Sequence, residues 1–195
     1  MTVTRVLTDG QANLASGATA WFNLEEQDFK ELMRLYRSYR REAVRSTDSK
    51  AYLAGCVMAA AALEAALLAM IHIHAREVEA AGLVPNIRRQ PKPLLKWTLP
   101  EMLRAASGMD WLPSGLQLGG AWIARRAKIG DYAEALRQIR NLIHAARYVQ
   151  DHSPSRVTKR YLEGSLAILE GATTHLEAKV NASLRKWIAQ KDNAQ

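Results

Sequence analysis

Cysteine is nearly absent from this chain of 195 residues, and this absence limits its chemistry. The single Cys56 excludes an internal disulfide, and its place in an alanine-rich apolar run predicts a buried, unreactive thiol. The first residues also lack the charged start and apolar centre of a secretory signal. A reducing compartment suits such a chain, so we expect a cytoplasmic protein.

Acidic side chains are fewer than basic ones, with 19 Asp and Glu against 27 Lys and Arg, for a formal net charge of +8. A basic surface favours nucleic acid, an anionic membrane or an acidic partner, without choosing among them. Long hydrophobic runs are also scarce. The one from Ala51 to Ile71 is rich in alanine and carries Glu64 near its middle, where insertion into a bilayer would cost roughly 2.5–3.5 kcal/mol. We expect a central buried helix there, and no membrane partner.

Strand-like alternation of useful length is missing, whereas apolar residues recur at helical spacing. The sequence therefore predicts an all-α protein, an antiparallel bundle of four long helices plus short ones. We expect an N-terminal arm over 1–22 and a single helical domain over 23–195. The long helices are predicted near 24–45, 49–81, 131–151 and 154–190.

Capping residues set the expected ends of these helices. Asn23 with Glu26 forms a capping box for the first helix, and Asp48 or Ser49 can start the second, which Gly82 can end. The three prolines that follow argue against regular structure in the next loop. They are Pro85, Pro91 and Pro93.

A short helix is predicted after this loop. Thr98 and Glu101 form its capping box, and Gly108 ends it. Trp97 and Trp111 lie on either side and are expected to anchor the core.

The run from Arg137 to His144 contains the most informative residues. At 100° per residue, its helix collects aliphatic side chains on one side and a guanidinium–imidazole cluster on the other. That cluster consists of Arg137, Arg140, His144 and Arg147. Guanidinium groups bind phosphate and imidazole moves protons near neutral pH, so the cluster has both groups needed to cut RNA without a metal. A solvated basic face is the alternative interpretation.

Two further groups of residues could support such a site. Asn141, Arg147 and Tyr148 lie within or beside the run from Arg137 to His144 and could contact RNA. The first long helix carries a basic stripe, either a solvated face or a track for a phosphate backbone, in which Arg34, Arg37 and Arg41 are candidate RNA-binding residues. The whole stripe comprises Lys30, Arg34, Arg37, Arg41 and Arg45.

Glu64 shares a helix face with apolar residues, and a carboxylate there requires a partner. We predict that Arg137 or Arg140 pairs with it and supports the site, the alternative being a Glu that reaches the surface. His72 and His74 are two residues apart and make a poor metal pair, so we expect no metal and no cofactor.

Two regions of this chain resemble the HEPN superfamily, all-helical domains found in many prokaryotic toxin and defence ribonucleases. One is the alanine-rich run 61–68 and the other is 136–144, with its Arg140-Asn141 dipeptide and His144. The stretch from Trp97 to Leu112 is also similar, so the resemblance covers roughly residues 50–170.

The resemblance implies a homodimer whose two motifs face one groove and cleave RNA without a metal. Arg140, His144 and Arg137 would be the catalytic residues, and an antitoxin or a nucleotidyltransferase would be a natural partner. The family pattern places four to six residues between Arg and His, whereas three separate Arg140 from His144 and six separate Arg137 from it. A non-catalytic helical module that binds RNA or a partner protein is therefore the alternative.

Overall fold

The computed structural model describes residues 24–112 and 157–192, and these are mostly helical. The all-α class is confirmed. The described α-helices are α3 (Glu26–Asp48), α4 (Tyr52–Ile73), α5 (Ala75–Ala80), α6 (Leu99–Gly108) and α9 (Lys159–Asp192). The arm 1–22 and the predicted helix 131–151 lie outside the described residues.

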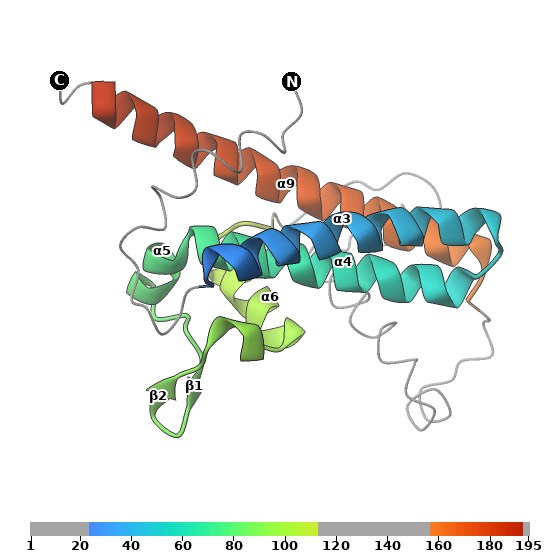
Figure 1. Ribbon diagram of the computed structural model, residues 1–195, viewed down its shortest axis with the longest axis horizontal. Coiled ribbons are helices and arrows are strands. Elements are labelled where there is room, and N and C mark those ends of the chain that lie inside the picture. Colours follow the sequence, from blue (N-terminus) through green and yellow to red (C-terminus); the bar gives the residue numbers. More distant parts are fainter. Residues whose placement is uncertain (1–23, 113–156, 193–195) are drawn as a thin grey trace.

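Helix α4 forms the centre of the molecule, with α3, α6 and α9 packed around it (Figure 1). Among the described helices, α4 alone is long and apolar enough to cross a membrane. However, 61% of its most apolar stretch is buried inside the protein. Leu63, Leu67 and Ile71 are fully buried along it. Its apolar composition is therefore accounted for by a position in the core, as predicted.

The three long described helices run in two directions. Helix α3 runs antiparallel to α4, whereas α9 runs in the same direction as α4 (Figure 1). Gly55 lies near the start of α4, and a Cβ atom there would come within 2.7 Å of Leu162 near the start of α9.

Both predicted starts of the first two helices are wrong. The N-cap of α3 is Glu25 rather than Asn23. Asp48 and Ser49 do not start α4, because Asp48 is the last residue of α3 and the Ser49 N–H donates to the carbonyl of Arg45, 3.2 Å away. The chain instead turns at Lys50, whose φ of 59° ends one helix before the next begins.

The predicted second helix is two helices. It breaks at His74, where α4 gives way to α5. Gly82 ends α5 as expected: its φ is 66°, and the Leu83 N–H donates to the carbonyl of Val78 at 3.1 Å, the geometry of a Schellman cap.

The proline-rich loop has regular structure, contrary to the prediction. Strands β1 (Asn86–Ile87) and β2 (Gln90–Pro91) form an antiparallel hairpin, and a 3₁₀ turn, η1 (Leu94–Lys96), follows it. Prolines are tolerated here because Pro91 lies in a two-stranded sheet, where each strand has a free edge.

The predictions for the two remaining described helices, α6 and α9, have different outcomes. The capping box of α6 and the burial of Trp97 and Trp111 are confirmed. Helix α9 begins at Lys159, after Val157 and Thr158, and so starts later than predicted. The Thr158 carbonyl and hydroxyl both lie within hydrogen-bond distance of the Tyr161 N–H, at 3.0 and 3.4 Å, and provide the cap.

Candidate nucleic-acid interface

The structure describes only part of the predicted site. Glu64 lies half-buried in the middle of α4, and the basic stripe lies on α3. The other predicted site residues lie within 113–156, outside the described residues, so the motif geometry and the Glu64–arginine pair stay predictions. These residues are Arg137, Arg140, Asn141, His144, Arg147 and Tyr148.

Helix α3 displays five exposed arginines, which we call the arginine face. Its members are Arg34, Arg37, Arg40, Arg41 and Arg45. With Tyr36 and Val44 they line an open hollow of about 640 Å³. The opposite side of α3 buries Phe29, Leu32 and Ala43 against the core, and this burial fixes which way the arginines point.

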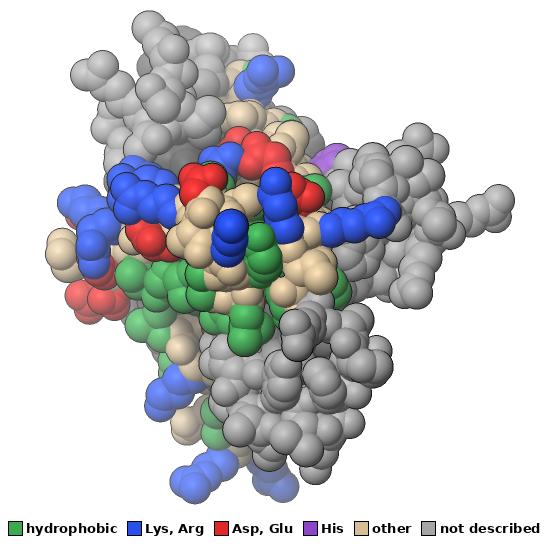
Figure 2. Space-filling model, turned by 90° about the vertical axis from the view of Figure 1, so that its right-hand side faces the viewer, with side chains coloured by type: hydrophobic (Ala, Val, Ile, Leu, Met, Phe, Trp, Pro, Cys, Tyr) green, Lys and Arg blue, Asp and Glu red, His purple; other side chains and the backbone are tan. Residues whose placement is uncertain are grey.

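Carboxylates neutralise three members of this face. Arg34 donates to both carboxylate oxygens of Glu31, at 2.8 and 2.6 Å, and this contact lowers the pKa of the Glu31 carboxyl. Arg45 lies 2.9 Å from the Glu42 carboxylate. Figure 2 views the end of the bundle where α3 meets α4 and shows acidic side chains among the basic ones. Exposed pairs of this kind contribute little to stability, so an incoming anion can displace them.

Arg40 is the member of the face that the sequence analysis missed. It lies 2.5 Å from Glu170 of α9, a residue 130 positions away. The sequence could have indicated Arg40, because it follows Arg37 by three residues, a spacing that places both side chains on neighbouring turns of the helix. Lys30, by contrast, was predicted in the stripe but pairs with Glu26 at 2.5 Å and does not line the hollow.

Arg37 and Arg41 differ from the other three arginines. Within residues 24–112 and 157–192, neither has an ion pair with a carboxylate. Both are exposed, and an unpaired guanidinium binds phosphate without first releasing another anion. These two of the predicted RNA-binding residues are therefore the better placed for an anionic ligand.

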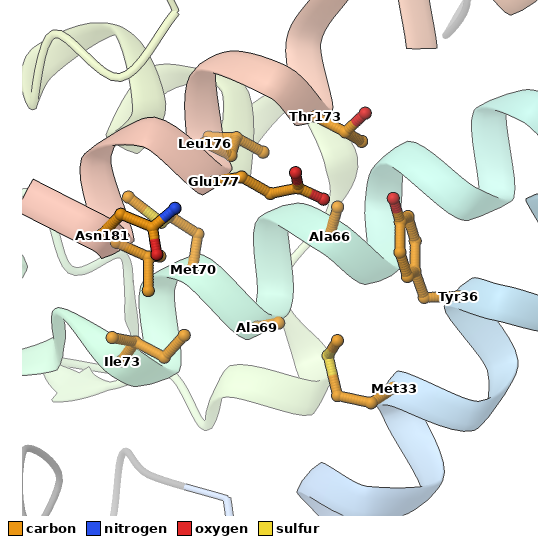
Figure 3. A pocket seen from close by; sticks show the side chains of 11 residues that line it. Met33, Tyr36, Ala66, Ala69, Met70, Ile73, Thr173, Leu176, Glu177 and Asn181 are labelled. Carbon is orange, nitrogen blue, oxygen red and sulfur yellow. The ribbon is translucent and has the colours of Figure 1, made fainter. Parts of the chain in front are cut away.

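Tyr36 connects the hollow to an apolar cavity beneath it. The cavity has a volume of about 70 Å³ and lies between α3, α4 and α9 (Figure 3). Burial raises the pKa of the Tyr36 hydroxyl, with Arg40 and a hydrogen bond to Thr173 acting in the opposite direction. An engineered cavity of 150 Å³ holds benzene, so this one can take only a small apolar group.

Cys56 and His72 are two buried polar side chains elsewhere that have structural partners. The Cys56 thiol is fully buried 3.6 Å from the Ser165 hydroxyl, and burial raises its pKa, as expected for an unreactive thiol. His72 accepts a hydrogen bond at Nδ1 from the Leu24 N–H at 3.2 Å and stacks against Phe29. Burial lowers its pKa from 6.5 to about 4, so it is neutral near pH 7.

Lys92 is a buried cation in the proline-containing loop that was predicted to be irregular. Its Nζ donates to both oxygens of Glu101, at 2.9 and 2.6 Å, and its carbonyl accepts from Trp97 Nε1 at 2.8 Å. Burial alone would raise the pKa of Glu101, but the bonds from Lys92 and Thr98 lower it. The residue that caps α6 thus also anchors the preceding loop.

Among the described residues, no group of three or more His, Cys, Asp and Glu side chains could hold a metal ion. No protein family, curated protein or solved structure matches the chain.

Proposed function

We propose that this protein is a cytoplasmic, HEPN-like endoribonuclease of the toxin or defence type that cuts RNA without a metal. The arginine face carries the RNA-binding part of the proposal, because it offers two exposed guanidiniums without carboxylate partners in the described residues beside three weakly paired ones. The chemistry rests on the sequence motif Arg140-Asn141 and His144.

The proposed reaction is an internal transfer of the phosphodiester. His144 takes the proton of a ribose 2′-hydroxyl, and the 2′-oxygen attacks the adjacent phosphorus. The bond from phosphorus to the 5′-oxygen breaks, and that oxygen takes up a proton. Arg140 and Arg137 stabilise the charge that develops on the phosphate oxygens. The products are a 2′,3′-cyclic phosphate and a 5′-hydroxyl.

Assembly completes the proposed site. Two copies would place their motifs in one groove, and an antitoxin or nucleotidyltransferase partner would hold the enzyme inactive. Light scattering at tens of micromolar, on the order of ordinary dimer affinities, should report a dimer. A monomer under these conditions would contradict this part of the proposal.

A non-catalytic RNA-binding module is the second candidate. The three-residue separation of Arg140 from His144 favours it, because a catalytic pair must reach the same phosphate. The arginine face serves either function equally well, so only a test of chemistry distinguishes them.

The deciding experiment incubates the purified chain with labelled RNA and with DNA of the same sequence, in the presence of EDTA. We expect cleavage of RNA alone. His144→Ala should reduce the rate by roughly 10²–10⁴-fold, the usual contribution of a general acid or base. The matched control is the double variant Arg37→Ala/Arg41→Ala, which should weaken binding and flatten its salt dependence while leaving the rate at saturating RNA unchanged. Binding without cleavage would leave the module as the function.

A further inference from the structure

A second basic region lies away from the arginine face. We define the hairpin arm as residues 86–96, which comprise β1, β2 and η1. Its hairpin projects from the helical bundle (Figure 1). Of the three exposed large hydrophobic side chains in the described structure, two belong to the arm: Ile87 is 45% exposed and Leu95 is 61% exposed.

Apart from Lys92, the cations of the arm have no ion pair with a carboxylate in the part of the chain that the structure describes. Arg88, Arg89 and Lys96 are exposed, and no ion pair joins any of them to another described residue. The sequence between Glu79 and Glu101 contains no acidic residue. Glu101 itself is occupied by Lys92. The arm therefore combines positive charge and aliphatic surface without the acidic neighbours that accompany most arginines of α3.

The arm is also held in one shape. Arg88 and Arg89 form the two-residue turn with φ values of 51° and 66°, the signature of a type I′ turn, which favours Asn and Gly. Arginine in this conformation is strained. The base is fixed by the Lys92 N–H, which donates to the Pro85 carbonyl at 2.8 Å. Strained residues at an exposed tip suggest a function that requires those side chains there.

We propose that the hairpin arm binds the surface of an anionic lipid bilayer. Arg88, Arg89 and Lys96 would contact the phosphate groups, while Ile87 and Leu95 would enter the layer between headgroups and acyl chains. A phosphodiester backbone matches the charges but gives the two aliphatic side chains little to contact, whereas a bilayer supplies both chemistries. Pro91 and Pro93 lack an N–H, which lowers the cost of moving this backbone out of water.

This contact is peripheral and does not depend on the proposed ribonuclease activity. It departs from the sequence-based expectation of no membrane partner, because that expectation concerned α4 as a membrane-spanning segment. Helix α4 stays in the core in either case.

The test measures co-sedimentation of the whole chain with two kinds of vesicle, pure phosphatidylcholine and a mixture with about a third phosphatidylglycerol. We expect binding to the anionic vesicles, reduced by high salt, and little binding to the neutral ones. Each cation near an anionic surface contributes about fivefold, so Arg88→Ala/Arg89→Ala should weaken binding about 25-fold. The matched control is Arg37→Ala/Arg41→Ala, which removes the same charge from α3 and should bind nearly as well as the wild type.

The aliphatic contribution is tested separately. Ile87→Ser/Leu95→Ser should weaken vesicle binding about tenfold, whereas Val44→Ser, at the exposed hydrophobic of α3, should not. Equal losses in the two arginine pairs would show general attraction by net charge and overturn the proposal. The same holds if anionic vesicles bind no better than neutral ones. If the arm variants lose affinity for single-stranded RNA but keep vesicle binding, the arm contacts RNA and the proposal is wrong.

Discussion

The three-helix core and the hairpin arm are stabilised by different means. In the core, α3, α4 and α9 bury small and aliphatic side chains with the backbones close together, as at Gly55. The arm buries one large side chain, Leu94, and otherwise depends on a few polar contacts, of which the Lys92–Glu101 pair and the Trp97–Lys92 bond are central. A segment of a few residues cannot bury enough apolar surface to order itself, so specific hydrogen bonds must do so.

The largest expected effect is in the core. Leu63 is fully buried on α4, and Leu63→Ala should lower the free energy of unfolding by about 2–5 kcal/mol. Urea denaturation followed by circular dichroism measures it. The control is Leu95→Ala on the arm, which should change stability by less than about 0.5 kcal/mol because the side chain is already exposed. Equal losses would contradict the distinction between the two regions.

Acid should also destabilise the core. The pKa of His72 is lowered from 6.5 to about 4, so the unfolded chain binds a proton that the folded chain does not. This contribution to stability is complete above pH 6.5 and is lost as the pH falls towards 4, by about 3 kcal/mol in total. The measurement is urea denaturation between pH 7 and pH 4.

A variant isolates this effect. His72→Gln removes the titrating group, so its stability should change less with pH than that of the wild type. Parallel pH profiles for the two proteins would refute the assignment to His72.

Close helix packing gives a third test. A methyl group in Gly55→Ala would lie 2.7 Å from Leu162 and 2.8 Å from Ser46, so the helices must move apart at a cost of about 1–3 kcal/mol. Calorimetry should show a lower melting temperature. Gly108→Ala is the comparison: its new methyl would also come within 2.7 Å of a leucine, Leu83, but that side chain lies near the surface and can move. A larger loss in Gly108→Ala would contradict this account.

The smallest expected effect concerns the arm. Lys92→Met keeps most of the packing but removes the bond to Glu101, and should cost about 1–2 kcal/mol. Hydrogen exchange should speed up around residues 85–101 and change little in α3 and α4. Uniform acceleration along the chain would show that the arm and the core open together.

Helical periodicity predicted much of the fold because it depends on local residue order. It correctly indicated an all-α protein and a buried α4, and the capping residues correctly indicated a glycine end at Gly82 and the capping box of α6. It missed the break at His74 and the start of α3, since several residues can cap a helix and tertiary packing selects one. For the site, it predicted the exposed arginines Arg34, Arg37 and Arg41, while their ion pairs could not be inferred from residue type.

The sequence by itself determined the all-α class, the buried cysteine and the charge of α3, because backbone hydrogen bonding and burial of apolar stripes are decided within a few turns. Only the tertiary structure decided that Arg40 meets Glu170, that Lys92 is buried against Glu101 and that a proline-rich loop folds into a hairpin. Those features join side chains from different elements, and their pairing depends on where the packed helices bring each one.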